Sequence, residues 1–310
     1  MFVAMVAEPI PAVSLDLPEA DFTAGFGHSL ERFGFAVVAD HGLDPKVIET
    51  ARKAAKALFA LPAETKLRYR IAGGAGQRGY TPFAVETAKD HADADLKEFW
   101  HVGRETERPQ GPLLDNVWPA EIPPFRPAAL ALFASFEALG QRLLTAIETH
   151  LGLTAPLISN AAAGGNSVLR FLHYPVGDFS GPSLRAAPHE DINAITLLLG
   201  AEEAGLEVLS REGAWLAINP PPGAVVVNIG DMLSRLTNEH LPSTTHRVVN
   251  PASERAGVAR YSMPFFMHFR SDFVIETLPE CIAPGAPDRY PRPITAAAYL
   301  DQRLKELRLT

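Results

Sequence analysis

Two histidines and one aspartate, His189, Asp191 and His246, are the residues of this chain whose types and spacing point most directly to chemistry. Residues i and i+2 of an extended strand project to the same face, so His189 and Asp191 can face one metal ion while Glu190 points away. His246 lies in residues 243–250, a run whose threonine and valine content is typical of a strand. Two imidazoles and one carboxylate are the facial triad that holds non-haem Fe(II) and leaves coordination positions open. We therefore predict an iron centre at these three residues.

An arginine and a serine two positions apart, Arg260 and Ser262, follow the second histidine in another expected strand. Both side chains can enter one cavity, where a guanidinium binds a carboxylate through two parallel N–H bonds and a hydroxyl donates one more. A buried arginine among apolar neighbours requires an anionic partner to offset its desolvation. Tyr174 could offer its phenol to the same carboxylate, although a tyrosine at a strand end more often packs and hydrogen-bonds locally. The Arg-x-Ser pair favours a small dicarboxylate as co-substrate.

Each part of this pattern is common and uninformative alone. An isolated His-x-Asp is more often part of a surface loop, a lone strand histidine is usually a structural hydrogen-bonding group, and an edge-strand arginine commonly pairs with a surface carboxylate. The inference depends on the order of the parts along the chain: His189-x-Asp191, then His246, then Arg260-x-Ser262. Together they suggest an oxygenase that uses iron, O2 and 2-oxoglutarate.

This order resembles that of the 2-oxoglutarate/Fe(II) oxygenases of the isopenicillin N synthase-like family. The Tyr174-Pro175 step also matches, and the likeness extends to residues 10–15, 33–42, 78–80 and 95–99, so it covers nearly the whole chain. The resemblance implies a 2-oxoglutarate- and Fe(II)-dependent dioxygenase that couples oxidative decarboxylation of 2-oxoglutarate to hydroxylation, desaturation or cyclisation of a small molecule. It implies that the iron ligands are His189, Asp191 and His246, and that the distal carboxylate of 2-oxoglutarate is held by Arg260, Ser262 and Tyr174.

The chain departs from the family pattern at Leu172, where many plant members carry an asparagine, and in a longer gap before Arg260 that we assign to a hairpin loop at residues 251–257. Three alternative functions stay open. A 2-oxoglutarate-independent iron oxidase resembling isopenicillin N synthase would use the Arg-x-Ser pair on its substrate. A zinc hydrolase also accepts two histidines and a carboxylate, but no hydrolase-type general base stands beside the ligands. A non-catalytic binding protein would have no chemical reason to keep all three ligands.

The elements that must position these residues form a helical N-terminal part and a strand-rich C-terminal part. Asp44-Pro45 is a favourable start for a helix running to about Ala60, and further helices are expected at residues 127–151 and 296–308. Between residues 167 and 269, short strands alternate with Gly/Pro turns, which favours an antiparallel sandwich or jelly roll. These strands are expected at residues 169–174, 194–199, 206–210, 215–218, 224–228, 244–249 and 260–268.

The family resemblance implies the α+β fold class, with a double-stranded β-helix (jelly-roll) core buttressed by N-terminal and C-terminal helices. Because no Gly/Ser linker separates the parts, we expect residues 1–310 to form a single integrated domain. Its parts are a helical region over about 1–150, the oxygenase core over about 151–270, and a C-terminal extension with a helix over 271–310. Substrate identity is expected to depend on residues 78–83 and 99–101 and on the cavity face of the sheet. Arg170 and Arg185 are expected at the surface rather than at an acidic substrate.

Composition excludes several classes of partner. Hydrophobic residues make up 47% and charged residues 21% of the 310-residue chain, which is ordinary for a soluble globular enzyme. The formal net charge of −8 argues against nucleic acid as a partner. The single cysteine, Cys281, excludes an internal disulfide and fits a reducing compartment. Because we find neither a secretory signal nor an uncharged apolar run of about 20 residues, we expect a cytoplasmic protein without a membrane partner. The oligomeric state stays open.

Overall fold

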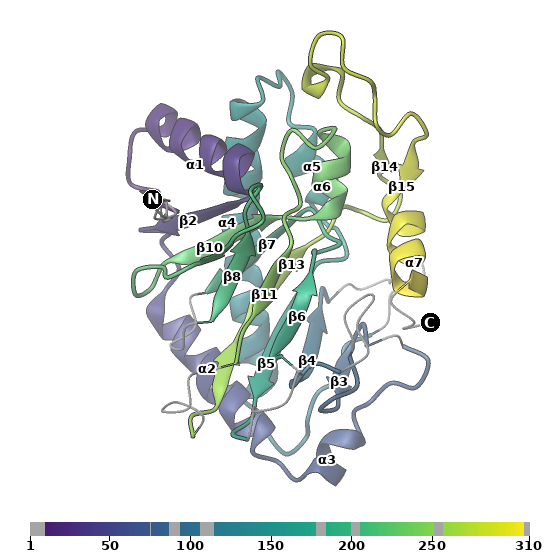
Figure 1. The fold of residues 1–310 in the computed structure, drawn as a ribbon. Helices are drawn as coiled ribbons and strands as arrows, with labels where there is room; N and C mark the ends of the chain where they lie inside the picture. The colour runs from purple at the N-terminus through teal and green to yellow at the C-terminus, as the bar shows by residue number, and fades with distance from the viewer. Residues whose placement is uncertain are drawn as a thin grey trace, which may run out of the picture.

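The computed structural model of the protein describes residues 10–74, 76–86, 94–105, 115–177, 184–199, 205–250 and 257–306. Within them, Figure 1 shows three layers: helices, a large β-sheet and a small β-sheet. Helices cover one face of the large sheet, and the small sheet packs on the other. This arrangement confirms the expected α+β class. The expected hairpin loop at residues 251–257 lies outside the described residues, apart from Gly257.

Local sequence signals set the ends of the N-terminal helices. The Asp44 carboxylate caps α2 by accepting a hydrogen bond from the Lys46 backbone N–H at 2.8 Å, and Pro45 occupies the first helical position. Helix α1 ends at Gly34, whose φ of 68° is a left-handed conformation that glycine adopts without strain. The described helices are α1 (Glu19–Phe33), α2 (Pro45–Phe59), α3 (Ala63–Leu67), α4 (Phe125–His150), α5 (Ile158–Ala162), α6 (Asp231–Leu236) and α7 (Ala296–Glu306), with a 3-10 turn at Pro279–Cys281.

The large sheet has nine strands among the described residues, in the order β1-β2-β10-β7-β13-β5-β4-β3, with β12 also paired to β5. Alternate residues of its strands pack against the helices and form the main core, as Leu169 and Phe171 of β5 and Phe265 of β13 do. Its strands are β1 (Ala12–Ser14), β2 (Phe35–Ala39), β3 (Gly79–Thr81), β4 (Glu98–Gly103), β5 (Val168–Tyr174), β7 (Ile195–Leu199), β10 (Val225–Ile229), β12 (Arg260–Ser262) and β13 (Pro264–Met267).

The small sheet has the order β6-β11-β8-β9. A second hydrophobic core lies between the sheets, where Val37 of β2 and Val226 of β10 meet Ala186 of β6 and Val208 of β8. The strands are β6 (Ala186–His189), β8 (Leu206–Leu209), β9 (Trp215–Ala217) and β11 (His246–Val248); a separate pair, β14 (Val274–Ile275) and β15 (Ile294–Thr295), precedes α7. The two sheets therefore enclose the region in which the predicted site residues lie.

Two expectations about the elements are wrong. The N-terminal part is not purely helical, because β1 to β4 join the large sheet. Strands β2 and β4 are buried along nearly their whole length, so they lack the alternating pattern that identifies a strand with one solvated face. The single strand expected at residues 260–268 is two strands, β12 and β13, which separate at Met263. Pro264 begins β13 and has no N–H to continue a ladder there.

Helix α4 is long and apolar enough to cross a membrane by length and composition alone. Half of its most apolar stretch is buried inside the protein, as in the central helix of a globular core. Its Phe136 is fully buried and stacks on Phe265 of β13, with ring centroids 5.6 Å apart. The helix thus supports the large sheet from the face opposite the site.

Candidate metal centre

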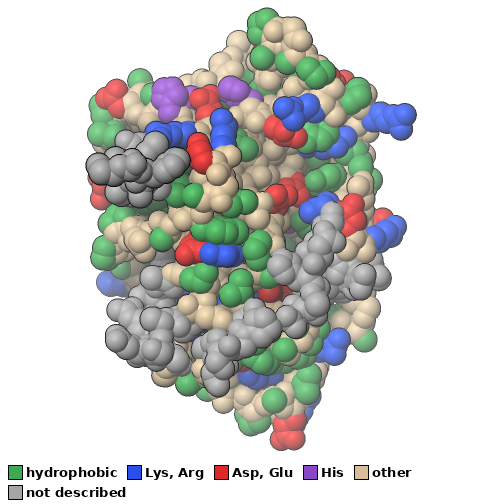
Figure 2. All heavy atoms as spheres, in the orientation of Figure 1, with side chains coloured by type: hydrophobic (Ala, Val, Ile, Leu, Met, Phe, Trp, Pro, Cys, Tyr) green, Lys and Arg blue, Asp and Glu red, His purple; other side chains and the backbone are tan. Residues whose placement is uncertain are grey.

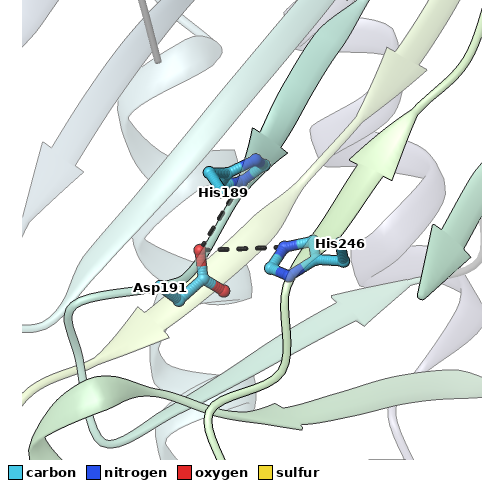
Figure 3. A group of neighbouring side chains, drawn as sticks. All are labelled: His189, Asp191 and His246. Atoms are coloured by element: carbon cyan, nitrogen blue, oxygen red, sulfur yellow. Dashed lines mark ion pairs between the residues drawn. The ribbon is translucent and has the colours of Figure 1, made fainter. Parts of the chain in front are cut away.

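The two histidines of the predicted iron centre meet because β6 and β11 pair antiparallel with His246 opposite His189. Their ring centroids are 4.4 Å apart. Asp191 follows β6 directly, and its Oδ1 lies 3.9 Å from Nε2 of His189 and 4.0 Å from Nε2 of His246 (Figure 3). One candidate ligand atom from each residue lies within 4.8 Å of the others. Glu190 is exposed and binds Thr245, so the expected alternation of facing is confirmed.

Hydrogen bonds to the backbone fix which nitrogen each histidine offers. Nδ1 of His189 lies 2.8 Å from the Ala187 carbonyl oxygen, and Nδ1 of His246 lies 3.1 Å from that of Thr244. A carbonyl only accepts, so each Nδ1 carries the proton and donates it. The Nε2 lone pairs are therefore left for a metal. Such contacts orient metal-ligating histidines and raise their basicity.

The carboxylate of Asp191 is oriented in the same way. Its Oδ2 accepts hydrogen bonds from the Thr196 hydroxyl at 2.5 Å and from the Asn228 side-chain amide at 2.8 Å. Thr196 of β7 and Asn228 of β10 are paired across the large sheet, so the sheet itself positions both donors. With Oδ2 occupied, Oδ1 is the oxygen that faces the histidines.

The electrostatics of the site favour the ligand forms of these residues. Burial, together with the neighbouring His246, lowers the pKa of His189 to about 4, so its imidazole is neutral at pH 7. Burial alone would raise the pKa of Asp191, but the two histidines and the bonds from Asn228 and Thr196 outweigh it and lower that pKa. Two imidazole nitrogens and an ionised carboxylate form a donor set that fits Fe(II).

The residues predicted to hold 2-oxoglutarate lie together on neighbouring strands. In the β5–β12 ladder, Arg260 pairs with Tyr174 and Ser262 pairs with Leu172. Arg260, Ser262 and Tyr174 are all buried. The Arg260 guanidinium carbon lies 5.3 Å from the centroid of the Tyr174 ring. Leu172 forms a small apolar cluster with Phe99 and Tyr174, in place of the polar contact that an asparagine would provide.

Sequence reasoning missed several side chains around this site. Arg185 is only 1% exposed and its guanidinium carbon lies 5.7 Å from the Tyr174 ring, so the expected surface position is wrong. Arg170 is also largely buried. Thr196 and Asn228 carry no sequence signal of their own, because they reach Asp191 only through the pairing of β7 with β10.

A separate pocket of about 740 Å³ lies between α6, the C-terminal segment and α7. Its lining includes Glu190, Asp231 and Arg303 but none of the three candidate metal ligands and none of the predicted 2-oxoglutarate residues. It lies on the side toward which Glu190 points, and it is not part of the predicted site.

Comparisons with known proteins identify the family of this chain. The family model described as the 2OG-Fe(II) oxygenase superfamily matches residues 165–269. A second family model, described as 'non-haem dioxygenase in morphine synthesis N-terminal', matches residues 10–121. A 2-oxoglutarate-Fe(II) type oxidoreductase of Emericella nidulans is 32% identical over 284 residues, which cover 86% of this chain and 79% of that protein. The chain belongs to the 2-oxoglutarate/Fe(II) oxygenase superfamily.

Solved structures extend the likeness of this oxygenase to the whole fold. A protein of Caulobacter crescentus assigned to the 2OG-Fe(II) oxygenase family matches with a TM-score of 0.90 and 53% identity, covering 96% of this chain and 99% of that chain. A Neurospora crassa protein crystallised with alpha-KG (2-oxoglutarate) and thymine matches with a TM-score of 0.85 and 29% identity, covering 96% of each chain. The expected jelly-roll core is thereby confirmed.

The oxygenase is an enzyme, a 2-oxoglutarate- and Fe(II)-dependent dioxygenase that uses Fe(II) as its cofactor and 2-oxoglutarate and O2 as co-substrates. It couples oxidative decarboxylation of 2-oxoglutarate to oxidation of a small-molecule substrate. These comparisons give no support to the 2-oxoglutarate-independent alternative.

Proposed function

We propose that His189, Asp191 and His246 hold the Fe(II) of this oxygenase, and that Arg260, Ser262 and Tyr174 hold the distal carboxylate of 2-oxoglutarate. The observation that carries the proposal is the convergence of two histidine Nε2 atoms on Oδ1 of Asp191, with the other polar atom of each side chain already hydrogen-bonded. Three ligand atoms that face one another in this way can bind a single metal ion together.

The protein's own residues then bind, orient and exclude water. When bound, iron and 2-oxoglutarate supply the oxidising chemistry, which consumes 2-oxoglutarate and O2 and yields succinate, CO2 and an oxidised substrate. The Arg260 guanidinium neutralises the far carboxylate of the co-substrate through charge-assisted hydrogen bonds, and Ser262 adds a further donor. Burial of these groups keeps water from competing for the carboxylate and strengthens each contact.

We infer that the substrate is a small organic molecule that enters beside His189, whose side chain is 32% exposed whereas that of Asp191 is 7% exposed. Two similar proteins were crystallised with such molecules, the Neurospora crassa protein with thymine and JOX2 with JA. Figure 2 shows acidic and basic side chains interspersed over one face of the molecule. We propose that nucleic acid is not a partner, for which the formal net charge of −8 is the support. We also propose a cytoplasmic location, for which the free, buried thiol of Cys281 is the support.

The proposal is tested by screening small molecules for stimulated succinate formation from 2-oxoglutarate by the iron-loaded protein. We expect His246→Ala to abolish this activity and to weaken Fe(II) binding while the fold persists, because two ligands chelate poorly. Glu190→Ala is the matched control: its side chain lies between two candidate ligands in sequence but points away, so activity should persist. Unchanged iron affinity in alanine variants of all three candidate ligands would refute the assignment.

A further inference from the structure

A group of charged and aromatic side chains lies beside the candidate metal centre, on the face of the sheet that carries the site. Alternation along β5 places Arg170 on the same face as Leu172 and Tyr174. Arg170 is therefore four residues along the strand from Tyr174, one of the residues proposed to hold 2-oxoglutarate. On β13, Phe266 is paired with Thr196, the residue that holds Asp191. Arg170 and Phe266 are therefore close to both parts of the site.

The Arg170 guanidinium is held on its faces and on its edges. Its central carbon lies 4.1 Å from the Phe99 ring centroid and 5.1 Å from that of Phe266. Its Nε donates to Nε2 of His101 at 2.5 Å. Both terminal nitrogens donate to Glu86, at 3.3 and 3.2 Å. Because each terminal nitrogen carries two hydrogens, one on each is left for a further acceptor.

The charges balance among the side chains that form ion pairs with one another around Arg170; the nearby Arg78 guanidinium donates instead to Gln77 and Asn166. Lys97 pairs with Glu86 and with Asp95, each at 2.7 Å, so two cations face two carboxylates. Asp95 also accepts a hydrogen bond from the Ala187 N–H of β6, the strand that ends at His189. We call these five residues the Arg170 cluster: Glu86, Asp95, Lys97, His101 and Arg170.

Three members of the cluster, Glu86, His101 and Lys97, are held in the form that this balance requires. Burial tends to raise the pKa of Glu86, but Arg170 and Lys97 outweigh it and the pKa falls, so the carboxylate is ionised. Burial and the Arg170 charge together lower the pKa of His101 well below its usual value, so the ring is neutral and accepts from Arg170. The ammonium of Lys97 stays charged because Glu86 and Asp95 raise its pKa despite burial.

A balanced cluster discriminates between classes of ligand. A carboxylate or phosphate bound to Arg170 would add an uncompensated negative charge to a largely buried site, which is costly. An uncharged ligand keeps the balance. It can accept from the remaining Arg170 hydrogens and donate to the Glu86 carboxylate, which has lone pairs beyond those that Arg170 and Lys97 use.

We propose that the Arg170 cluster is the substrate-recognition subsite of this oxygenase, and that it selects an uncharged, planar molecule with a hydrogen-bond acceptor and donor side by side, as in an amide or lactam edge. Phe266, which is partly exposed, provides a flat surface against which such a molecule packs, and the buried Phe99 ring supports the Arg170 guanidinium from below. This inference rests on the proposed function, because it assumes that the substrate is oxidised at the neighbouring metal centre. Arg170 and Glu86 are exposed by 16% and 17%, so both are within reach of a ligand.

The test compares matched pairs of probes that share a shape and differ in charge: benzamide with benzoate, and nicotinamide with nicotinate. Binding is followed anaerobically through the change that each probe causes in the visible band of the protein loaded with Fe(II) and 2-oxoglutarate. We expect the amide of each pair to bind at least about tenfold more tightly than the acid. Only the amide can donate a hydrogen bond to the Glu86 carboxylate, and a hydrogen bond to a charged group contributes that much or more.

Two variants should move this preference in known directions. Glu86→Gln leaves the cluster with a net positive charge, so the amide-to-acid affinity ratio should fall by about tenfold or reverse. Arg170→Gln leaves it net negative, so amide binding should weaken by about tenfold and the acid should gain nothing. The control is Glu137→Gln, which removes a carboxylate bound in the same two-point manner to Arg104 but located on α4; its ratio should match the wild type.

The outcomes separate this inference from the proposed function. Absence of the band before any probe is added counts against the 2-oxoglutarate site itself. If the band is present, the recognition proposal is overturned when the wild type prefers the acids, when no probe alters the band, or when folded Glu86→Gln and Arg170→Gln both keep the wild-type ratio. The wild-type comparison decides the question even if a variant fails to fold.

Discussion

At the scale of single residues, the candidate iron site depends on groups that bind no metal themselves. The Asp191 carboxylate is aimed by Thr196 and Asn228, and each histidine is aimed by a backbone carbonyl. Removing such a supporting contact typically costs about 10- to 100-fold in metal affinity. The supporting residues therefore offer a finer test of the site than the ligands, because their loss should weaken the site without dismantling it.

We predict that Thr196→Val, which removes the donor at nearly constant volume, raises the dissociation constant for Fe(II) by about 10- to 100-fold. Anaerobic titration with Fe(II) measures this directly. Thr277→Val is the matched control, because Thr277 is also a buried threonine that donates to an aspartate, Asp288, but lies in the C-terminal segment. Equal iron affinities for the two variants would show that the Thr196 contact does not orient the carboxylate.

The residues of the candidate site were predictable to different degrees, for physical reasons. The structure brings together His189, Asp191 and His246 as predicted, because alternation along a strand relates the first two and order along the chain identifies the third. Arg170 was misjudged because an arginine in a strand looks the same in sequence whether its partner is a solvent-exposed carboxylate or a buried one. Arg185 lies just before β6, and nothing in its local sequence records that the fold buries it. Glu86 and Lys97 lie far from Arg170 in sequence, so only the fold reveals their charge balance.

At the scale of elements, β5 links the parts of the site and α4 supports the sheet behind them. One face of β5 carries Arg170, Leu172 and Tyr174, and the other packs Leu169 and Phe171 into the main core. Helix α4 completes that core through Phe136, which stacks on Phe265 of β13. The precision of the site thus depends on aromatic packing on the opposite side of the sheet.

We predict that Phe136→Ala lowers the free energy of unfolding by about 3–5 kcal/mol, the usual cost of deleting a buried phenylalanine. Chemical denaturation of the iron-free protein measures this change. Leu157→Ala, which removes an apolar side chain that is 40% exposed, should change stability by less than about 0.5 kcal/mol. A Phe136→Ala protein as stable as the Leu157→Ala protein would contradict the role assigned to α4.

Helices were more predictable than strands because their ends carry chemical signals. The Asp44-Pro45 pair predicted the start of α2. The run of alanine, leucine and phenylalanine residues in α4 predicted that helix to within two residues at each end. β3 and β4 were missed because β4 is buried on both sides and β3 has only three residues, so neither shows a pattern of period two. Their place in the sheet is defined by the pairing of β4 with β5 and of β3 with β4, which no local pattern records.

At the scale of the whole molecule, we propose that the N-terminal part and the jelly-roll core fold as one unit. β1 and β2 extend one edge of the large sheet and β3 and β4 extend the other, so that β2 pairs with β10 and β4 pairs with β5. The main hydrophobic core is continuous from α1 and α2 to β13 and α7. Neither part could bury its apolar face alone.

Calorimetry should therefore record one cooperative unfolding transition, and Fe(II) with 2-oxoglutarate should move it as a whole to higher temperature by mass action. The iron-free protein in chelator is the reference. Two resolved transitions, of which only one responds to the ligands, would show that the N-terminal part is an independent domain.

The measurement that tests the account most directly is an anaerobic titration of the Fe(II) protein with 2-oxoglutarate, followed by the weak visible band that chelation of a 2-oxo acid produces. We predict a saturable band for the wild type and none for His246→Ala. For Arg260→Leu we predict nearly unchanged Fe(II) binding but at least about tenfold weaker 2-oxoglutarate binding, because losing a charged contact from a desolvated site costs about 2–5 kcal/mol. A wild type without the band, or an Arg260→Leu protein that titrates like the wild type, would contradict the assignment of metal and co-substrate residues.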